Sequence, residues 1–166
     1  VYFFDDYTGR MPGYIEKWKE LDLSFDGIVS GFLGSEDQIG IVMDMIRDFG
    51  HEDTKIIIDP IMGDHGETYA TYTQVMCRRM KALVSMGSIV TPNLTEACLL
   101  TDTPYPESMP DNDFLSKTAE KLHAMGPSKL VITGITQENN FHNYFSTLTP
   151  SRQEAVYTTE AGGPSR

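Results

Sequence analysis

The chain has 166 residues, of which 40% are hydrophobic, which is ordinary for one globular domain with a buried core. Its formal net charge of −11 repels nucleic-acid phosphates, so we expect no nucleic-acid partner. No apolar run approaches the length that spans a bilayer, so we expect no membrane partner. A cytoplasmic location is expected because Cys77 and Cys98 fit reduced thiols better than a disulfide or a zinc site.

Short β-rich runs alternate with amphipathic helical runs along the chain. A strand is predicted at residues 26–31, and a helix then begins after Ser35, with Gln38 three residues on as a capping box. The next strand, Lys55–Asp59, contains three consecutive isoleucines, and such a run is typical of a parallel strand covered on both faces. These elements begin a βαβ pattern.

The remaining elements continue this pattern. They are a helix at 73–86, a strand at 88–91, a helix at 93–100, a proline-containing loop at 101–112, a helix at 113–125 and a strand at 129–133. Residues 134–166 are expected to be irregular or antiparallel, with a turn at Asn139-Asn140, and residues 1–13 receive no assignment. Cys77 and Cys98 fall in predicted helices and are expected to be reduced thiols. The predicted fold class is α/β, with a mostly parallel sheet flanked by helices on both faces, in one domain over residues 1–166.

Polar residues and glycines follow the end of every predicted strand. These ends are Gly31–Gly34, Asp59–Asp64, Thr91–Asn93 and Thr133–Gly134, and Glu96 lies one turn into the helix after Asn93. Ligands of open parallel sheets bind beyond the carboxyl ends of the strands, so we expect these residues to share one edge. Carboxylates suit Mg²⁺ and glycines let backbone N–H groups approach phosphate, so this edge predicts a phosphate–magnesium site.

Several of these segments resemble one enzyme family. Asp59-Pro60-Ile61-Met62-Gly63-Asp64 resembles the D-P-[VI]-[ML]-G-D segment of pyridoxal kinases, and Thr91–Ala97 resembles their T-P-N-x-x-E-A segment, which carries the Asn-x-x-Glu motif of the ribokinase-like superfamily. Val131–Gly134 resembles the strand that contacts nucleotide, and Ser30–Gly34 the segment that lines the substrate pocket. The matches keep the family's order from about residue 24 onward, so the resemblance implies a ribokinase-like core.

The resemblance also implies roles for individual residues. ATP and its phosphates would be contacted by Asp59, Asp64, Tyr69, Thr91, Thr133 and Gly134. Mg²⁺ would be held by Asp64, Asn93 and Glu96, partly through water, and Phe32 would pack near the pyridine ring of the substrate. Asn93-x-x-Glu96 is also an ordinary helix cap, and a capping role and a metal role are compatible.

The activity implied is transfer of the γ-phosphate of ATP to the 5′-hydroxyl of pyridoxal, pyridoxine or pyridoxamine, in vitamin B6 salvage. ATP and Mg²⁺ would be needed, a monovalent cation is a further candidate, and a homodimer is expected. Kinases of hydroxymethylpyrimidine or its phosphate are the close alternative. They share the Asp-Pro-Val-Met opening but usually lack Gly-Asp directly after it, so Gly63-Asp64 favours the B6 branch.

The family's catalytic base is not assigned within this sequence. Ribokinase-like enzymes carry a late Gly-[Thr/Ala]-Gly-Asp motif, whose Asp takes the proton from the substrate hydroxyl. Residues 161–166 resemble the approach to this motif, so the resemblance implies that the catalytic Asp lies beyond Arg166. The family's N-terminal strands are likewise expected outside the sequence. A non-catalytic nucleotide-binding fragment is therefore the third interpretation.

Overall fold

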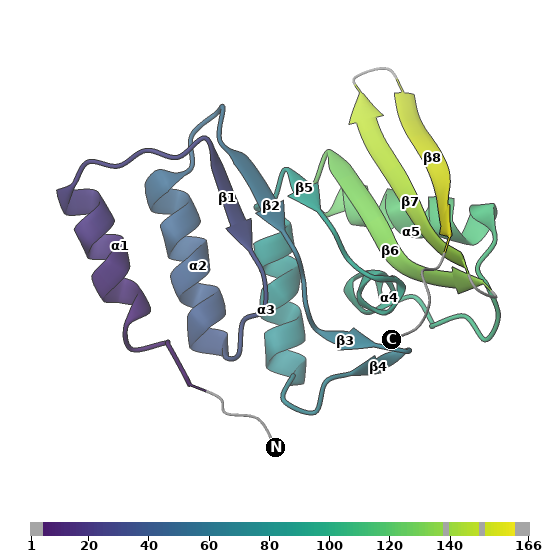
Figure 1. Ribbon diagram of the computed structural model, residues 1–166, viewed down its shortest axis with the longest axis horizontal. Helices are drawn as coiled ribbons and strands as arrows, with labels where there is room; N and C mark the ends of the chain where they lie inside the picture. The colour runs from purple at the N-terminus through teal and green to yellow at the C-terminus, as the bar shows by residue number, and fades with distance from the viewer. Residues whose placement is uncertain (1–4, 138–139, 150–151, 162–166) are drawn as a thin grey trace.

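The computed structural model describes residues 5–137, 140–149 and 152–161 (Figure 1). Its main sheet has the strand order β1-β2-β5-β6-β7-β8. The strands are β1 (Gly27–Ser30), β2 (Lys55–Ile58), β5 (Ile89–Val90), β6 (Lys129–Gln137), β7 (Asn140–Thr149) and β8 (Arg152–Ala161). The first four in this order are parallel, and β7 and β8 join antiparallel. A separate two-stranded hairpin, β3 (Gly63–Asp64) with β4 (Glu67–Thr68), follows β2.

Among the described residues, five helices connect or precede these strands: α1 (Met11–Glu20), α2 (Glu36–Phe49), α3 (Gln74–Val84), α4 (Leu94–Thr101) and α5 (Asn112–Ala124). Helices α2 to α5 begin as predicted, because each N-cap side chain accepts an N–H from the first helical turn. Helix α1 was not predicted. Ile15 is its one buried residue, so its sequence carries little helical periodicity.

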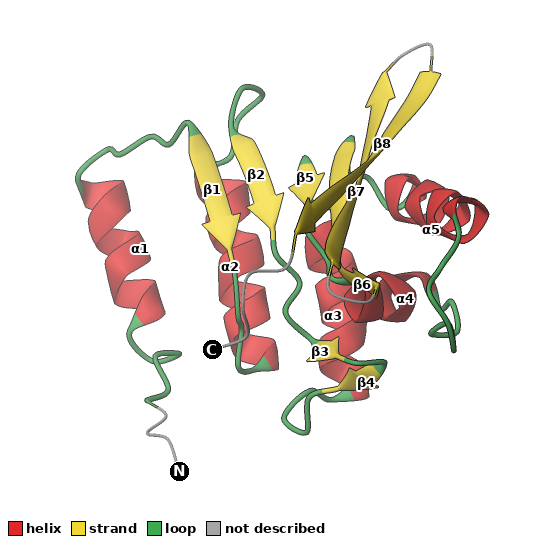
Figure 2. Ribbon diagram, turned by 45° about the vertical axis from the view of Figure 1, so that its right-hand side comes forward, coloured by secondary structure: helices red, strands yellow, loops and turns green. Residues whose placement is uncertain are grey.

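One face of the sheet is covered by the helices (Figures 1 and 2). Ser30, Ile58, Val90 and Leu130 form a row across the four parallel strands on this face, and none is more than 6% exposed. On the other face Val29 is 69% exposed, and Ile57 and Ile89 are half-buried. The predicted fold class, a mostly parallel α/β sheet, is confirmed, and the helices that the described residues form cover one of its faces.

The C-terminal part is antiparallel, one of the two possibilities expected. Strand β6 runs on to Gln137, past the predicted end at residue 133, and its pairing with β7 shifts register between Ile132 and Ile135. The predicted turn at Asn139-Asn140 lies partly outside the described residues. Within the described part of the chain, no helix has the length and apolar character needed to cross a membrane.

Candidate functional site

The loop after β2 begins where three strand ends meet. The Asp59 N–H donates to the Ser30 carbonyl at the end of β1 over 3.1 Å. The Thr91 hydroxyl, one residue beyond β5, donates to Asp59 Oδ1 over 3.2 Å. Burial raises the pKa of Asp59, and the hydrogen bond from Thr91 partly opposes this rise. The structure thus brings Asp59 and Thr91 together at the expected edge.

Asn93 and Glu96 form a capping box at the start of α4, as their spacing predicts. Asn93 Oδ1 accepts the Glu96 N–H at 2.9 Å, and Glu96 Oε2 accepts the Asn93 N–H at 2.7 Å. Both side chains also reach the loop after β2: Glu96 Oε1 accepts the Met62 N–H at 3.1 Å, and Asn93 Nδ2 donates to the Gly63 carbonyl at 2.8 Å. The box therefore fastens the loop to the helix in addition to capping it.

Glu96 is only 3% exposed. Burial raises its pKa to about 7, while N–H groups of Asn93 and Met62 act in the opposite direction and the charge of Asp59 adds to the rise. A cation near Asp59 and Glu96 would relieve their repulsion and favour the ionised form of Glu96. The site therefore has an electrostatic reason to bind a cation.

The hairpin β3–β4 carries Asp64 at its tip. Asp64 is exposed, and its Oδ1 accepts the His65 N–H at 2.8 Å. The turn is completed by Gly66, whose φ of 83° favours glycine and whose N–H donates to Thr95 Oγ1 on α4 over 2.9 Å. Asp64-His65-Gly66 is an ordinary turn signal in the sequence, whereas Thr95 was not singled out.

Gly63 allows β3 and β4 to pair at close range. A Cβ atom added at Gly63 would lie 2.2 Å from the Glu67 carbonyl oxygen. We therefore expect Gly63→Ala to open the hairpin and lower the free energy of unfolding by about 1–3 kcal/mol, the usual range for overpacking. Urea unfolding would measure this change. Gly31→Ala is the matched control, because a Cβ atom there meets nothing within 4 Å; equal stability of the two variants would contradict the expectation.

The sequence predicts a strand end at Thr133, and this point within β6 lies against the start of α4. The Thr133 N–H donates to the Pro92 carbonyl over 2.9 Å, and Thr133 forms a parallel bridge with Asn93. Gly134 has a φ of 71°, and a Cβ atom there would come within 3.2 Å of Asn93 Cβ. Glycine at residue 134 therefore permits the close approach of β6 to the capping box.

A cavity of about 490 Å³ opens beside this junction. Two of the predicted nucleotide-site residues, Asp64 and Gly134, line it together with Thr95, Tyr105, Met109 and Phe141. Its volume lies within the range of small-molecule sites. Tyr105 comes from the 101–112 loop, and its ring lies 3.0 Å from where a Cβ atom of Gly66 would be. Sequence reasoning missed Tyr105, because this long-range contact has no local signature.

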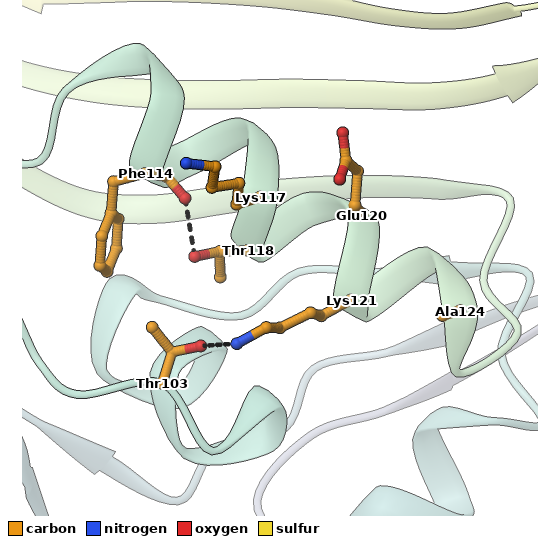
Figure 3. A pocket seen from close by; sticks show the side chains of 7 residues that line it. All are labelled: Thr103, Phe114, Lys117, Thr118, Glu120, Lys121 and Ala124. Carbon is orange, nitrogen blue, oxygen red and sulfur yellow. Dashed lines mark hydrogen bonds between the residues drawn. The ribbon is translucent and has the colours of Figure 1, made fainter.

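A second cavity, of about 460 Å³, lies between α5 and the segment after α4 (Figure 3). Lys121 Nζ donates to Thr103 Oγ1 there over 2.9 Å, and Phe114 and Lys117 also line it. Thr103 follows the carboxyl end of α4, whereas Asn93 caps its start, so one helix of roughly 12 Å separates the two regions. This cavity is not part of the predicted site.

Phe32 and Tyr69 keep large parts of their rings exposed, at 46% and 42%. Phe32 follows β1 by two residues. The Tyr69 N–H donates to the Met62 carbonyl over 2.9 Å, and burial, then the charges of Asp64 and Glu96, raise the pKa of its hydroxyl. Both residues are thus near the edge that carries Asp59 and Glu96, and their contacts with ligands stay predictions.

Among the described residues, no group of three or more His, Cys, Asp or Glu side chains could hold one metal ion. The predicted ligand set of Asp64, Asn93 and Glu96 includes an amide, so it is a different kind of group and stays a prediction. Mg²⁺ is commonly held by one or two carboxylates, with waters and substrate phosphates as the other ligands. The carboxylates of Asp59 and Glu96 are ligands of this kind, and both oxygens of Glu96, like both polar atoms of the Asn93 amide, also bond to the chain.

Comparisons with known proteins identify the family of this chain. The sequence profile of the family described as phosphomethylpyrimidine kinase matches residues 19–162. Pyridoxal kinase of Arabidopsis thaliana is 33% identical over 116 residues, which cover 69% of this chain and 36% of that protein.

Solved structures give the same result. A Bacteroides thetaiotaomicron protein assigned as a phosphomethylpyrimidine kinase is 34% identical to this chain, with a TM-score of 0.91. The superposition covers all of this chain and 57% of the Bacteroides chain. Its crystal form with pyridoxal has a TM-score of 0.87, covering 95% of this chain and 56% of its own. Pyridoxal kinase of Leishmania donovani, in complex with ADP and pyridoxamine, is 16% identical with a TM-score of 0.73, covers 95% of this chain and 55% of its own, and supports the fold alone.

The chain spans about a third of the length of the Arabidopsis relative and somewhat more than half of the solved structures. The profile match nevertheless covers most of the chain, including β1, the loop after β2, the capping box and β6. The chain therefore belongs to the phosphomethylpyrimidine kinase and pyridoxal kinase family.

Proposed function

We propose that the complete protein containing this chain is an ATP-dependent kinase that phosphorylates the 5′-hydroxyl of a B6 vitamer. The observation that carries the proposal is the double attachment of the capping box, through Glu96 and Asn93, to the Asp59–Asp64 loop. This arrangement gathers carboxylates and backbone N–H groups at the strand ends, where phosphoryl transfer needs positioning and neutralised charge. The pyridoxal-bound crystal form of a 34% identical relative supports a B6 vitamer as the substrate.

Each part of the edge would have a distinct task. Asp59 and Glu96 would hold Mg²⁺, partly through water, and Mg²⁺ when bound would neutralise phosphate charge. Gly134 lines the cavity, and its backbone would face the β- and γ-phosphates, while its missing side chain lets β6 lie close to Asn93. The cavity between Asp64 and Tyr105 would take another part of the nucleotide.

The substrate would lie on the β1 side of Asp59. Phe32 is exposed two residues beyond β1, and an aromatic ring is suited to stack on a pyridine ring. The hydrogen bond from the Asp59 N–H to the Ser30 carbonyl links the substrate side of the edge to its phosphate side. The substrate hydroxyl and the γ-phosphate would therefore meet near Asp59.

A pyrimidine kinase of thiamine synthesis is the second candidate, because the matching family profile carries that description. Gly63 favours the B6 branch, since members that act on the pyrimidine usually lack Gly-Asp after the shared opening. The two substrates have different rings but similar hydroxymethyl acceptors, so the edge itself suits both.

Steady-state kinetics of the complete gene product would decide between them. We expect Mg²⁺-dependent transfer from ATP to pyridoxal, pyridoxine or pyridoxamine, with kcat/KM at least about tenfold above that for hydroxymethylpyrimidine, which corresponds to about 1.4 kcal/mol. A preference for hydroxymethylpyrimidine or its phosphate would favour the second candidate. Absence of transfer to all these acceptors would contradict both.

A further inference from the structure

Gln38 is a buried polar residue in the first turn of α2, close to the substrate side of the proposed site. It is 8% exposed. Its N–H donates to the Ser35 side chain over 3.2 Å, which is one half of the predicted capping box. In the ordinary box the side chain of residue 38 would accept the N–H of Ser35 itself. Here Gln38 Oε1 accepts the Gly34 N–H instead, at 2.7 Å.

The other end of the Gln38 amide is bonded to the N-terminal segment. Gln38 Nε2 donates to Asp6 Oδ1 over 3.1 Å and to Thr8 Oγ1 over 2.9 Å. The Thr8 N–H also donates to Asp6 Oδ1, over 2.9 Å, so residues 6–8 form a small turn against α2. The hydrogen bonds from Thr8 hold the pKa of Asp6 below its ordinary value, which keeps it an anionic acceptor for Gln38.

The loop that Gln38 holds, residues 31–34, connects β1 to α2 and carries Phe32. Within the described part of the chain, this loop makes one hydrogen bond, from Gly34 to Gln38. Its other anchor is the buried side chain of Leu33, which is 6% exposed. Ser30, just before the loop, accepts the Asp59 N–H, so a displacement of the loop would alter the position of Phe32 relative to Asp59.

We propose that Gln38 is a positioning residue that fixes the 31–34 loop, and with it Phe32, against the acceptor substrate. The inference rests on the proposed kinase function and adds a residue to it that touches neither nucleotide nor acceptor. A buried amide with both ends bonded is costly to disturb, because each freed group loses its partner. The Asp6–Thr8 segment takes part by holding the amide in the orientation that presents Oε1 to Gly34.

Substitutions at residue 38 can separate the roles of the two ends of the Gln38 amide. Gln38→Ala removes both sets of bonds. Gln38→Glu keeps an acceptor for the Gly34 N–H but sets a carboxylate opposite Asp6 and removes the donors to the N-terminal segment. Ser35→Ala is the control in the same helical turn: it removes the N-cap acceptor of α2 and leaves the Gly34 bond in place.

The test measures KM for pyridoxal and for ATP in the complete gene product, together with melting temperature. We expect Gln38→Ala to raise KM for pyridoxal about five- to tenfold, the equivalent of one lost hydrogen bond, with KM for ATP within about twofold of wild type. Gln38→Glu should recover most of the loss, and Ser35→Ala should lower the melting temperature without a selective change in either KM. An unchanged KM for pyridoxal in Gln38→Ala, an equal rise in both KM values, or the same pattern in Ser35→Ala would overturn the proposal.

Amide hydrogen exchange separates this inference from the proposed function. The Gly34 N–H should exchange at least about tenfold faster in Gln38→Ala than in wild type, and at nearly the wild-type rate in Gln38→Glu. A wild-type protein that phosphorylates no B6 vitamer would contradict the proposed function and the role toward the acceptor. An unchanged Gly34 exchange rate in Gln38→Ala would overturn the anchoring itself, whatever the activity.

Discussion

Replacing Glu96 with alanine is expected to lower stability and turnover together. The change leaves the Met62 and Asn93 N–H groups without their acceptor at a buried position, and each such loss costs about 1–3 kcal/mol. The expected loss of unfolding free energy is therefore about 2–6 kcal/mol, more than the roughly 0.5–2 kcal/mol of an ordinary helix cap. Urea unfolding would measure it. This is a larger loss than the spacing of Asn93 and Glu96 alone predicts.

Turnover by the folded fraction tests the second role of Glu96. Removal of a group that holds or orients a metal ion usually lowers activity or metal affinity by about 10–100-fold. Glu96→Gln is the matched variant, because it keeps the length of the side chain and one acceptor oxygen. We expect it to retain more stability than Glu96→Ala and still lose about tenfold or more in Mg²⁺-dependent turnover. Wild-type turnover by folded Glu96→Gln would mean that capping and loop attachment are the whole role of this residue.

Replacing Asp59 with asparagine is expected to stabilise the protein while removing most of its activity. Burial raises the pKa of Asp59, and its charge raises that of Glu96, so the ionised Asp59 disfavours the folded state. Asparagine removes the charge and keeps an oxygen for the Thr91 hydroxyl. A site that binds charged phosphates and a cation has reason to retain such a destabilising carboxylate.

The pH dependence gives this prediction a sign. An acid whose pKa is higher in the folded state than in the unfolded state makes its full contribution to stability at pH values below its unfolded-state pKa, near 3.9 for Asp. It loses this contribution as the pH rises through its folded-state pKa. Asp59→Asn should therefore match wild type near pH 4 and exceed it at pH 7. Its turnover should fall about 10–100-fold, as when a group that holds or orients a metal ion is removed.

Asp64→Asn is the control for the Asp59 variant, because Asp64 is exposed at the hairpin tip. We expect little change in unfolding free energy at either pH in this variant. Thermal or urea unfolding of wild type, Asp59→Asn and Asp64→Asn near pH 4 and at pH 7, together with kcat/KM, checks these predictions. A stability gain equal in both variants, or wild-type turnover in Asp59→Asn, would contradict the role given to Asp59.

The edge of the site could be predicted because its signals are local. Each parallel strand is a short apolar run, and the residue that follows it is a polar group or a glycine, such as Asp59 after Ile58. The cap residues Ser35 and Asn93 are visible from their spacing to Gln38 and Glu96. Once the strands are ordered in parallel, their ends must meet, so the shared edge follows from the order of the strands.

Other parts of the site depend on contacts between distant segments. The Gln38 side chain bonds to Gly34 rather than Ser35 in an arrangement that includes Asp6 and Thr8, about 30 residues earlier, and no local pattern predicts this. Tyr105 meets Gly66 across about 40 residues. The hairpin β3–β4 has strands of two residues each, which is too short for an alternating pattern.

Hydrogen–deuterium exchange of this chain with and without Mg²⁺–ATP locates the nucleotide without requiring turnover. If the strand-end edge binds the nucleotide, exchange should slow in the Asp59–Gly66 loop, at the Asn93–Glu96 box and at Thr133–Gly134. Slower exchange confined to the cavity between Thr103 and α5, with these three segments unchanged, would contradict it.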